Sequence, residues 1–369
     1  MKKVVLLNYT GSESNWGCQA TSSNLLSLIK KRPEISLEYI EIESKVSFYR
    51  RILNKIRMIL SFLIVHQKFT YFFSEFFKFL HPLERENINK LKNCDILILN
   101  GEGSLHGFTS ELIKFIQYLS YTSKLDKEII TVNQSLHFDN KKAKKYLKEV
   151  YRYSRINFFR EPISFENSVL LNIKHSYLVP DAAFLNCNLN SDELYSSSKI
   201  PKKYILASGS ILLTKESQSF FSLIDKLKNY YKYPVVFLAS CEADKELKNL
   251  IKQHYNYEYL DNVDVNFEQV QKIMMGAEFF ISGRFHMNIF SACVGKLFIP
   301  FESNTEKMQG LIDLLDYPLN PLNLSNFDVD QEFKKIQRII QESEVLERKI
   351  FYKSKVLAAK LEQSYENIL

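Results

Sequence analysis

The sequence lacks the residue patterns of several common functional sites. Its five cysteines lie far apart with no C-x-x-C pair, and such an odd, scattered set favours a reducing compartment over a disulfide framework or a zinc site. Neither G-x-G-x-x-G nor a Walker lysine motif is present, which excludes the usual dinucleotide and P-loop phosphate sites. H-E-x-x-H and G-x-S-x-G are also missing. The motifs therefore imply no metal and no cofactor.

Long apolar runs are missing as well. The longest, MILSFLIV, is far shorter than the roughly 20 residues of a membrane-spanning helix, and the apolar run at the N-terminus is too short for a signal peptide. We therefore expect a cytoplasmic protein, either soluble or peripheral on the inner face of the cytoplasmic membrane. The formal net charge is +7 over 369 residues, which suits a small anionic partner and does not require nucleic acid; we expect no nucleic-acid partner.

Short apolar runs alternate with helical patterns along most of the chain, which is typical of parallel βαβ construction. We predict strands at residues 3–8, 37–42, 94–100, 128–133, 156–159 and 176–180, and then at 204–210, 234–240, 257–261, 278–283 and 296–302. A polar stretch at 186–203 separates the two sets. The predicted fold is α/β, with two Rossmann-like, doubly wound lobes at 1–190 and 200–330 and a C-terminal helical tail at 331–369.

An insertion at residues 45–92 interrupts the first lobe. Its first half is basic and amphipathic, and its second half is dense in aromatic residues; the members are Lys45, Arg50, Arg51, Lys55 and Arg57, then Phe69, Tyr71, Phe72, Phe73, Phe76, Phe77 and Phe79. Basic residues beside an apolar stripe are typical of helices in a membrane interface. Two helices packed on the first lobe would also be rich in phenylalanine. Peripheral membrane contact through 45–80 and ordinary packing are therefore both open.

Polar and ionisable residues follow many of the predicted strands, where open parallel sheets bind their ligands. They are Asn15 and Trp16 after the first strand, Gly101, Glu102, Gly103 and His106 after the third, and His137, Arg160 and Asp181 after the next three; in the second lobe they are Ser282, Arg284 and His286, then Glu302 and Lys307. Arginines and histidines on amide-rich loops suit an anionic ligand. The residues thus predict an anion site, although the β-to-α turns themselves account for some of the glycines.

Five segments together resemble the polysaccharide pyruvyltransferase family. They are NWGCQAT, GEGSLHG, FFRE, VPDAAF and SGRFHMNIFSACVGKLFIPFESNTEKMQG, which occur in the family's order over residues 1 to 315. The resemblance implies a fold like that of GT-B glycosyltransferases. It also implies a transferase of surface-polysaccharide biosynthesis that moves pyruvate from phosphoenolpyruvate onto a sugar hydroxyl pair, forming a ketal. The glycine loop departs from the family's usual run of glycines, because Asn100 and Glu102 interrupt it.

The resemblance implies roles for individual residues. Arg160 and Arg284 would hold the donor's phosphate and carboxylate, and His286 would be the general acid or base. We assign catalysis to His286, Arg284 and His137, donor binding to Arg160, Arg284, Gly101, Gly103, Ser282, Glu302 and Lys307, and acceptor binding to Asn15, Trp16, Glu102, His106 and Asp181. The expected partners are an anionic small-molecule donor and a glycan or lipid-linked saccharide acceptor, without a metal.

Two other functions fit the same residues. A GT-B glycosyltransferase that uses a nucleotide-activated sugar, such as a sugar acid, would employ the same arginines, and the fold alone does not separate the two activities. A non-catalytic glycan-binding protein would not need so many converging ionisable groups.

Overall fold

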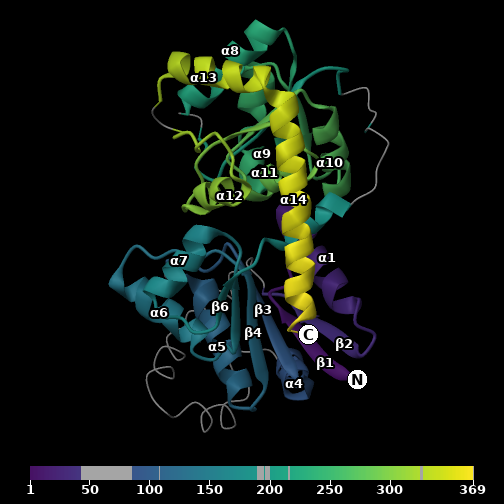
Figure 1. Cartoon of the computed structure of the whole chain (residues 1–369), viewed down its shortest axis with the longest axis vertical. Helices are drawn as coiled ribbons and strands as arrows, with labels where there is room; N and C mark the ends of the chain where they lie inside the picture. Colours follow the sequence, from purple (N-terminus) through teal and green to yellow (C-terminus); the bar gives the residue numbers. More distant parts are fainter. Residues whose placement is uncertain are drawn as a thin grey trace. The chain divides into compact units, whose positions relative to one another are not determined.

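The computed structural model describes residues 1–42, 85–107, 109–188, 195, 200–214, 217–324 and 327–368 (Figure 1). These residues form two compact units. Unit 1 comprises Met1–Thr10, Ile29–Phe159 and Asn167–Tyr177, and unit 2 comprises Gly11–Leu28, Arg160–Glu166 and Leu178–Leu369. The predicted lobes and these units divide the chain differently, since unit 2 takes Gly11–Leu28, Arg160–Glu166 and the start of Leu178–Leu369 from the range predicted for the first lobe. Most of the 45–92 insertion lies outside the described residues, so its two interpretations stay predictions.

Unit 1 contains a six-stranded parallel sheet. Its strands are β1 (Lys2–Leu7), β2 (Ile35–Ile40), β3 (Ile96–Glu102), β4 (Glu128–Gln134), β5 (Ile156–Phe159) and β6 (Ser176–Leu178), in the order β2-β1-β3-β4-β5-β6. Helices α4 (Arg85–Asn93), α5 (Ser110–Ser123) and α6 (Lys141–Tyr151) accompany it. The strand order reverses between β1 and β3, which is where a doubly wound sheet opens a ligand crevice.

Unit 2 contains a five-stranded parallel sheet. The strands are β7 (Ile205–Ser208), β8 (Val235–Ala239), β9 (Glu258–Asp261), β10 (Phe279–Ser282) and β11 (Phe298–Pro300), in the order β11-β10-β7-β8-β9. The helical elements are α8 (Gln218–Tyr231), α9 (Glu242–Lys245), η2 (Leu250–His254), α10 (Phe267–Gly276), α11 (Phe285–Cys293) and α12 (Lys307–Leu315). The order reverses between β7 and β10, so the residues just after these two strands lie at the switch point.

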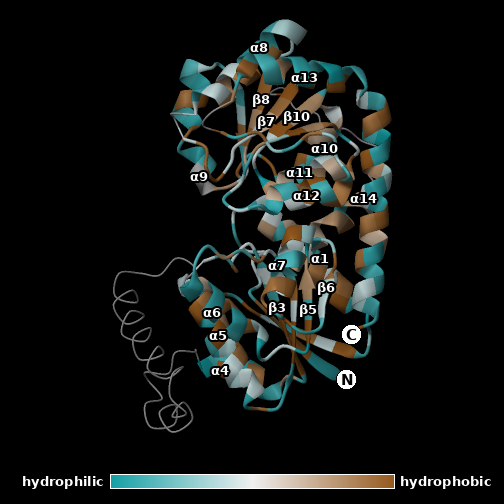
Figure 2. Ribbon diagram, turned by 60° about the vertical axis from the view of Figure 1, so that its left-hand side comes forward, coloured by the Kyte–Doolittle hydropathy of each residue, from teal (hydrophilic) through white to brown (hydrophobic). Residues whose placement is uncertain are grey.

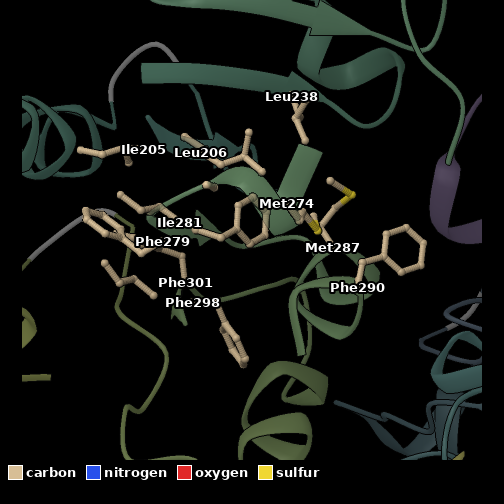
Figure 3. Packing of buried hydrophobic residues seen from close by; sticks show 14 of the residues in the cluster. Ile205, Leu206, Leu238, Met274, Phe279, Ile281, Met287, Phe290, Phe298 and Phe301 are labelled. Carbon is tan, nitrogen blue, oxygen red and sulfur yellow. The ribbon is translucent and has the colours of Figure 1, made fainter. Parts of the chain in front are cut away.

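The core of unit 2 consists of the apolar residues that the sequence places in strands and on inner helix faces. Figure 3 shows Ile205, Ile281 and Phe298 from three neighbouring strands together with Met287 and Phe290 of α11. Strands of a sheet covered on both faces are continuously apolar, and Figure 2 shows the strands largely in the hydrophobic colour. All eleven predicted strands are present, and the α/β fold prediction is confirmed.

Two helices form the predicted C-terminal tail. They are α13 (Val329–Gln341) and α14 (Ser343–Glu366). The second packs on α11 and on the 3₁₀ helix η1 (Ala182–Asn188), and it buries Ile350, Leu357 and Leu361. The tail is therefore part of unit 2. None of the described helices is long and apolar enough to cross a membrane.

Candidate active site

A buried ion pair joins two segments of unit 2. Arg160 follows β5 directly and precedes α7 (Pro162–Leu170), and its Nη1 donates to Oδ2 of Asp181 at 2.7 Å. Both side chains are about 1% exposed. The guanidinium also lies over the ring of Phe285, 4.4 Å from its centroid. A buried arginine is tolerated when it is paired in this way, and the pair holds the guanidinium in one orientation.

His286, in the first turn of α11, lies beside this pair. Its Nε2 is 3.5 Å from Asp181 Oδ2, 3.4 Å from Arg160 Nη1 and 3.4 Å from Thr21 Oγ1. The imidazole also lies against Gly17, where an added Cβ would be only 2.5 Å from Cγ of the ring and closer still to Nδ1. Gly17 and Thr21 are four residues apart, so both present the same face of α1 (Trp16–Lys30) to the histidine.

The charges of this cluster decide the protonation state of Asp181. Burial would raise the pKa of its carboxyl, but the positive charges of His286 and Arg160 outweigh burial and lower that pKa from 3.8 to about 2. The backbone N–H of Ala183 adds a hydrogen bond to Oδ1 at 2.8 Å. Asp181 is thus a carboxylate at every physiological pH.

The second arginine is held by a different carboxylate. Arg284 follows β10, and its Nη2 donates to Asp244 Oδ1 at 2.5 Å. Asp244 also accepts hydrogen bonds from Ser240, and an added Cβ on Gly209 would lie 2.8 Å from its carboxyl carbon. The backbone N–H of Arg284 donates to Ser282 Oγ at 2.9 Å. Arg284 therefore sits at the β7/β10 switch point, and its buried Nε has no hydrogen-bond partner among the described residues.

Lys307 begins α12 and adds a third cation. Its Nζ donates to Asn304 Oδ1 at 2.9 Å. Burial, together with the positive charges of Arg160 and Arg284, lowers the pKa of its ammonium from 10.5 to about 7. Both arginines act on this lysine, so each lies close enough to repel its positive charge. Such mutual repulsion is relieved by an anion bound among them.

Glu161 lies on the edge of the same cluster. It is buried, and burial raises the pKa of its carboxyl. The carboxylate oxygens accept from the backbone N–H of Ser164 at 3.2 and 3.1 Å, and from its hydroxyl. An added Cβ on Gly310 would lie 2.8 Å from the carboxyl carbon, so the glycine allows α12 to approach. Glu161 thus fixes the start of α7 against α12, which positions Arg160 and Lys307.

The other predicted residues of unit 2 have structural contacts. Asn15 caps α1, accepting from the backbone N–H of Gly17 at 2.9 Å. Trp16 is fully buried, with Nε1 donating to the carbonyl of Val265 at 3.1 Å. The side chain of Glu302 accepts from Asn323 at 2.8 Å. The burial of Trp16 does not favour the acceptor contact predicted for it. The same holds for Asp181, because its carboxylate is enclosed by protein groups. Both roles are untested.

The remaining predicted residues belong to unit 1. Glu102 ends β3 with a φ of 42°, and its Oε1 accepts from Thr10 Oγ1 at 2.6 Å and from Asn100 Nδ2 at 2.9 Å. His106 and His137 pair through their backbones, and His106 Nδ1 lies 2.5 Å from the carbonyl of Gly103. The polar residues that interrupt the glycine loop thus form a buried network at the β1/β3 switch point.

Gly101 has a packing reason to be glycine. An added Cβ would lie 2.6 Å from the Cβ of Gln134 on the neighbouring strand β4. The close approach of the two strands already requires a glycine at this position. Packing therefore accounts for Gly101, and its predicted role in donor binding stays untested.

Sequence reasoning missed several residues of the cluster in unit 2. Gly17 and Thr21 lie within NWGCQAT, and their spacing of four on a helix was a usable signal. Phe285 lies within the segment that begins SGRFH, where its position between Arg284 and His286 was a usable signal. Asp244 had no such signal, because it belongs to no recognisable pattern and its partner Arg284 comes from elsewhere in the sequence. Among the described residues, no three His, Cys, Asp or Glu side chains lie together so as to hold a metal ion.

Comparison with known proteins gives a family and a fold. The family model described as polysaccharide pyruvyl transferase matches residues 15–305. No curated protein matches the chain. Among solved structures, S. aureus MnaA with UDP is similar with a TM-score of 0.63 at 11% identity, covering 96% of this chain and 94% of that one.

Two further solved structures extend the fold similarity. Neisseria meningitidis UDP-GlcNAc 2-epimerase bound to UDP-GlcNAc has a TM-score of 0.58 at 12% identity, covering 98% of this chain and 99% of that one. Anabaena HepE in complex with UDP has a TM-score of 0.57 at 10% identity, covering 100% and 99%. At such identities the likeness shows a GT-B-like fold and nothing of the ligand.

Proposed function

Because the chain belongs to the polysaccharide pyruvyl transferase family, we propose that it transfers pyruvate from phosphoenolpyruvate to two hydroxyls of a sugar, forming a ketal. The observation that supports this donor is that Arg160 and Arg284 both act electrostatically on Lys307, while Arg160 also lies 3.4 Å from His286. Phosphoenolpyruvate carries a phosphate and a carboxylate, and planar guanidinium groups bind both more specifically than point charges do.

The proposed reaction begins with a proton transfer. Protonated His286 gives its proton to C3 of the donor, which turns the methylene into a methyl group and leaves C2 electron-poor. One sugar hydroxyl adds to C2 and returns its proton to the imidazole. The second hydroxyl then displaces phosphate from C2, and its proton leaves with the phosphate. The two hydroxyl protons thus end on the methyl group and on phosphate, with His286 regenerated.

The arginines and the lysine lower the energy of this sequence electrostatically. A cationic site holds the donor's carboxylate in place while negative charge moves onto the departing phosphate. Arg160 and Arg284 are each fixed by a buried aspartate, so they need not reorganise when the charge moves. Preorganisation of this kind is where most of the rate enhancement of such sites comes from.

The acceptor is proposed to be a glycan or lipid-linked saccharide on the cytoplasmic side of the membrane. Glu102 and His106 of unit 1 remain its candidate ligands, because they lie at the end of β3 and just after it, at the β1/β3 switch point where parallel sheets bind ligands. We further propose that no metal takes part and expect turnover to persist in EDTA. Turnover that needs added magnesium would contradict this.

The test of the donor is a comparison of ligands on the purified protein. A bound ligand at a hundredfold excess over its Kd stabilises the folded state by about 2.7 kcal/mol. We expect phosphoenolpyruvate, and not UDP-sugars, to raise the unfolding temperature, and we expect phosphate release once a suitable acceptor is added. Protection by a UDP-sugar alone would favour the glycosyltransferase alternative, for which the GT-B-like fold is equally suited.

A matched pair of variants separates binding from chemistry. His286→Ala should abolish phosphate release while the protection by phosphoenolpyruvate persists. Arg284→Ala should lose that protection, because it removes a donor-binding charge. Equal loss of protection in both variants would contradict the separate roles.

A further inference from the structure

One carboxylate oxygen in unit 2 faces two functional side chains. Oδ2 of Asp181 lies 2.7 Å from Arg160 Nη1 and 3.5 Å from His286 Nε2. The other oxygen, Oδ1, accepts from the backbone N–H of Ala183 at 2.8 Å. The carboxylate therefore contacts three parts of unit 2: Arg160 just after β5, Ala183 of η1 and His286 of α11.

The surroundings of Asp181 keep water away from this contact. Its side chain is fully buried, and helix α14 covers η1. Near the end of that helix, burial and then the negative charge of Asp181 raise the pKa of Tyr365 well above its usual value. Among the described residues, the ionisable groups that act on the carboxylate include Arg160, His286 and Tyr365. At neutral pH the tyrosine is uncharged, so it adds no charge to the field at Asp181.

These contacts decide which nitrogen of His286 carries a proton. A carboxylate oxygen only accepts hydrogen bonds. Arg160 already donates to this oxygen at a much shorter distance than it approaches the imidazole, 2.7 against 3.4 Å. Nε2 is therefore better placed to donate toward Asp181 than to accept from Arg160, and the hydroxyl of Thr21, 3.4 Å from Nε2, can accept from the same N–H. Nδ1 has no hydrogen-bond partner among the described residues, and the side chain is 15% exposed.

We propose that Asp181 is a positioning residue that holds the His286 proton on Nε2 and fixes Arg160 through the same oxygen, leaving Nδ1 as the nitrogen that exchanges protons with the substrates. The kinetic consequences of this inference rest on the proposed pyruvyl transfer. The position of the proton on Nε2 and the contact with Arg160 do not. Gly17 makes room for the imidazole in this position, because an added Cβ there would overlap the ring. The buried carboxylate also stabilises the positive charge that the imidazole bears before it donates its proton.

Asp181→Asn is the informative change, because it removes the charge and nearly preserves the shape. We expect kcat to fall by about 10²-fold to 10⁴-fold, as when a histidine loses the carboxylate that sets its tautomer. KM for phosphoenolpyruvate should stay equal or fall, because Arg160 loses a competing anion. The alkaline limb of the kcat profile should move to lower pH, because the imidazolium loses a negative neighbour.

Asp244→Asn is the matched control. Asp244 is equally buried and holds the other arginine at 2.5 Å, but no contact with His286 is recorded among the described residues. Asp244→Asn should change KM for the donor and leave the alkaline limb of the kcat profile at the same pH. Identical effects of the two substitutions on kcat, KM and the limb would overturn the proposal, because both aspartates would then have a merely structural role.

A spectroscopic readout tests the tautomer without any substrate. Nitrogen chemical shifts of ¹⁵N-labelled histidine distinguish the two neutral forms, and a His286→Gln sample assigns the signal among the seven histidines. We expect the wild-type protein to carry the proton on Nε2, and this measurement does not depend on whether Asp181→Asn folds. A proton on Nδ1 would overturn the proposal even if phosphoenolpyruvate is turned over. Conversely, an Nε2 proton with no pyruvyl transfer would leave the positioning intact and reject the proposed function.

Discussion

Replacement of Gly17 by alanine isolates the contact between α1 and the proposed acid–base histidine. The added Cβ would lie 2.5 Å from Cγ and 2.6 Å from Cβ of His286, well inside van der Waals contact. The ring has little room to retreat, because Asp181, Thr21 and Arg160 surround its Nε2 within 3.5 Å. The alanine therefore has to push either the imidazole or the start of α1.

Two opposing terms set the effect on stability. An alanine in a helix is favoured over glycine by about 0.5–1 kcal/mol. Overpacking of a buried site costs about 1–3 kcal/mol. The free energy of unfolding should therefore fall by at most about 2.5 kcal/mol. The effect on chemistry should be larger, because a displacement of a reacting group by about 1 Å can reduce turnover by about 10²-fold.

The assay measures urea unfolding and kcat on the same preparations. Ser27→Ala, at an exposed position of the same helix, controls for helix propensity and should leave kcat unchanged. We expect Gly17→Ala to lose about 10²-fold in kcat with a modest loss of stability. A variant that gains the full helix stabilisation and keeps normal turnover would refute the placement of the imidazole against Gly17.

Three further predictions follow from the charges of the chain. Arg160→Lys and Arg284→Lys should each lower kcat/KM for phosphoenolpyruvate at least tenfold, because the ammonium cannot form two parallel hydrogen bonds; near-normal values in both would reject the arginine clamp. Donor affinity should fall, by up to tenfold per pH unit, as pH rises through the pKa of about 7 of Lys307, because the lysine loses its charge. Calorimetric titrations should show a flatter dependence of donor affinity on pH in Lys307→Arg. An unchanged dependence in that variant would contradict the role of Lys307 in donor binding. Sedimentation with anionic liposomes should be salt-sensitive and lost when Arg50, Arg51, Lys55 and Arg57 are all changed to Glu; equal partitioning of both proteins would favour ordinary packing of the insertion.

The strands and the order of the elements followed from local patterns. Strands buried on both faces of a parallel sheet must be apolar throughout, so runs such as 94–100 and 234–240 are visible without any tertiary information. The start of helix α10 also carries a local signal, since Asn266 and Gln269 form a capping box there. Arg160, Arg284, His286 and Lys307 could be nominated because ligands gather beyond strand ends.

What each of these residues touches could not be read from the sequence. Arg160 and Asp181 are 21 residues apart, and Arg160 and His286 are 126 apart. Thr21 reaches the same imidazole across 265 positions. No local pattern encodes such pairings, because they depend on how the strand ends and α1 pack together. For this reason the contact between Asp181 and His286, 3.5 Å apart, could not be predicted, and the acceptor role assigned to Asp181 stays untested.

The sequence by itself determined the α/β class, the eleven strands and the set of ionisable groups at the strand ends, since burial and hydrogen bonding impose those patterns locally. Only the tertiary structure decided that Asp244 holds Arg284, that Gly17 makes room for the imidazole, and that α14 packs over η1 behind Asp181. The amphipathic pattern of the tail shows that one face is buried without showing against what. The partner of a buried face or charge is a property of the packed chain, because the residues that satisfy it come from distant parts of the sequence.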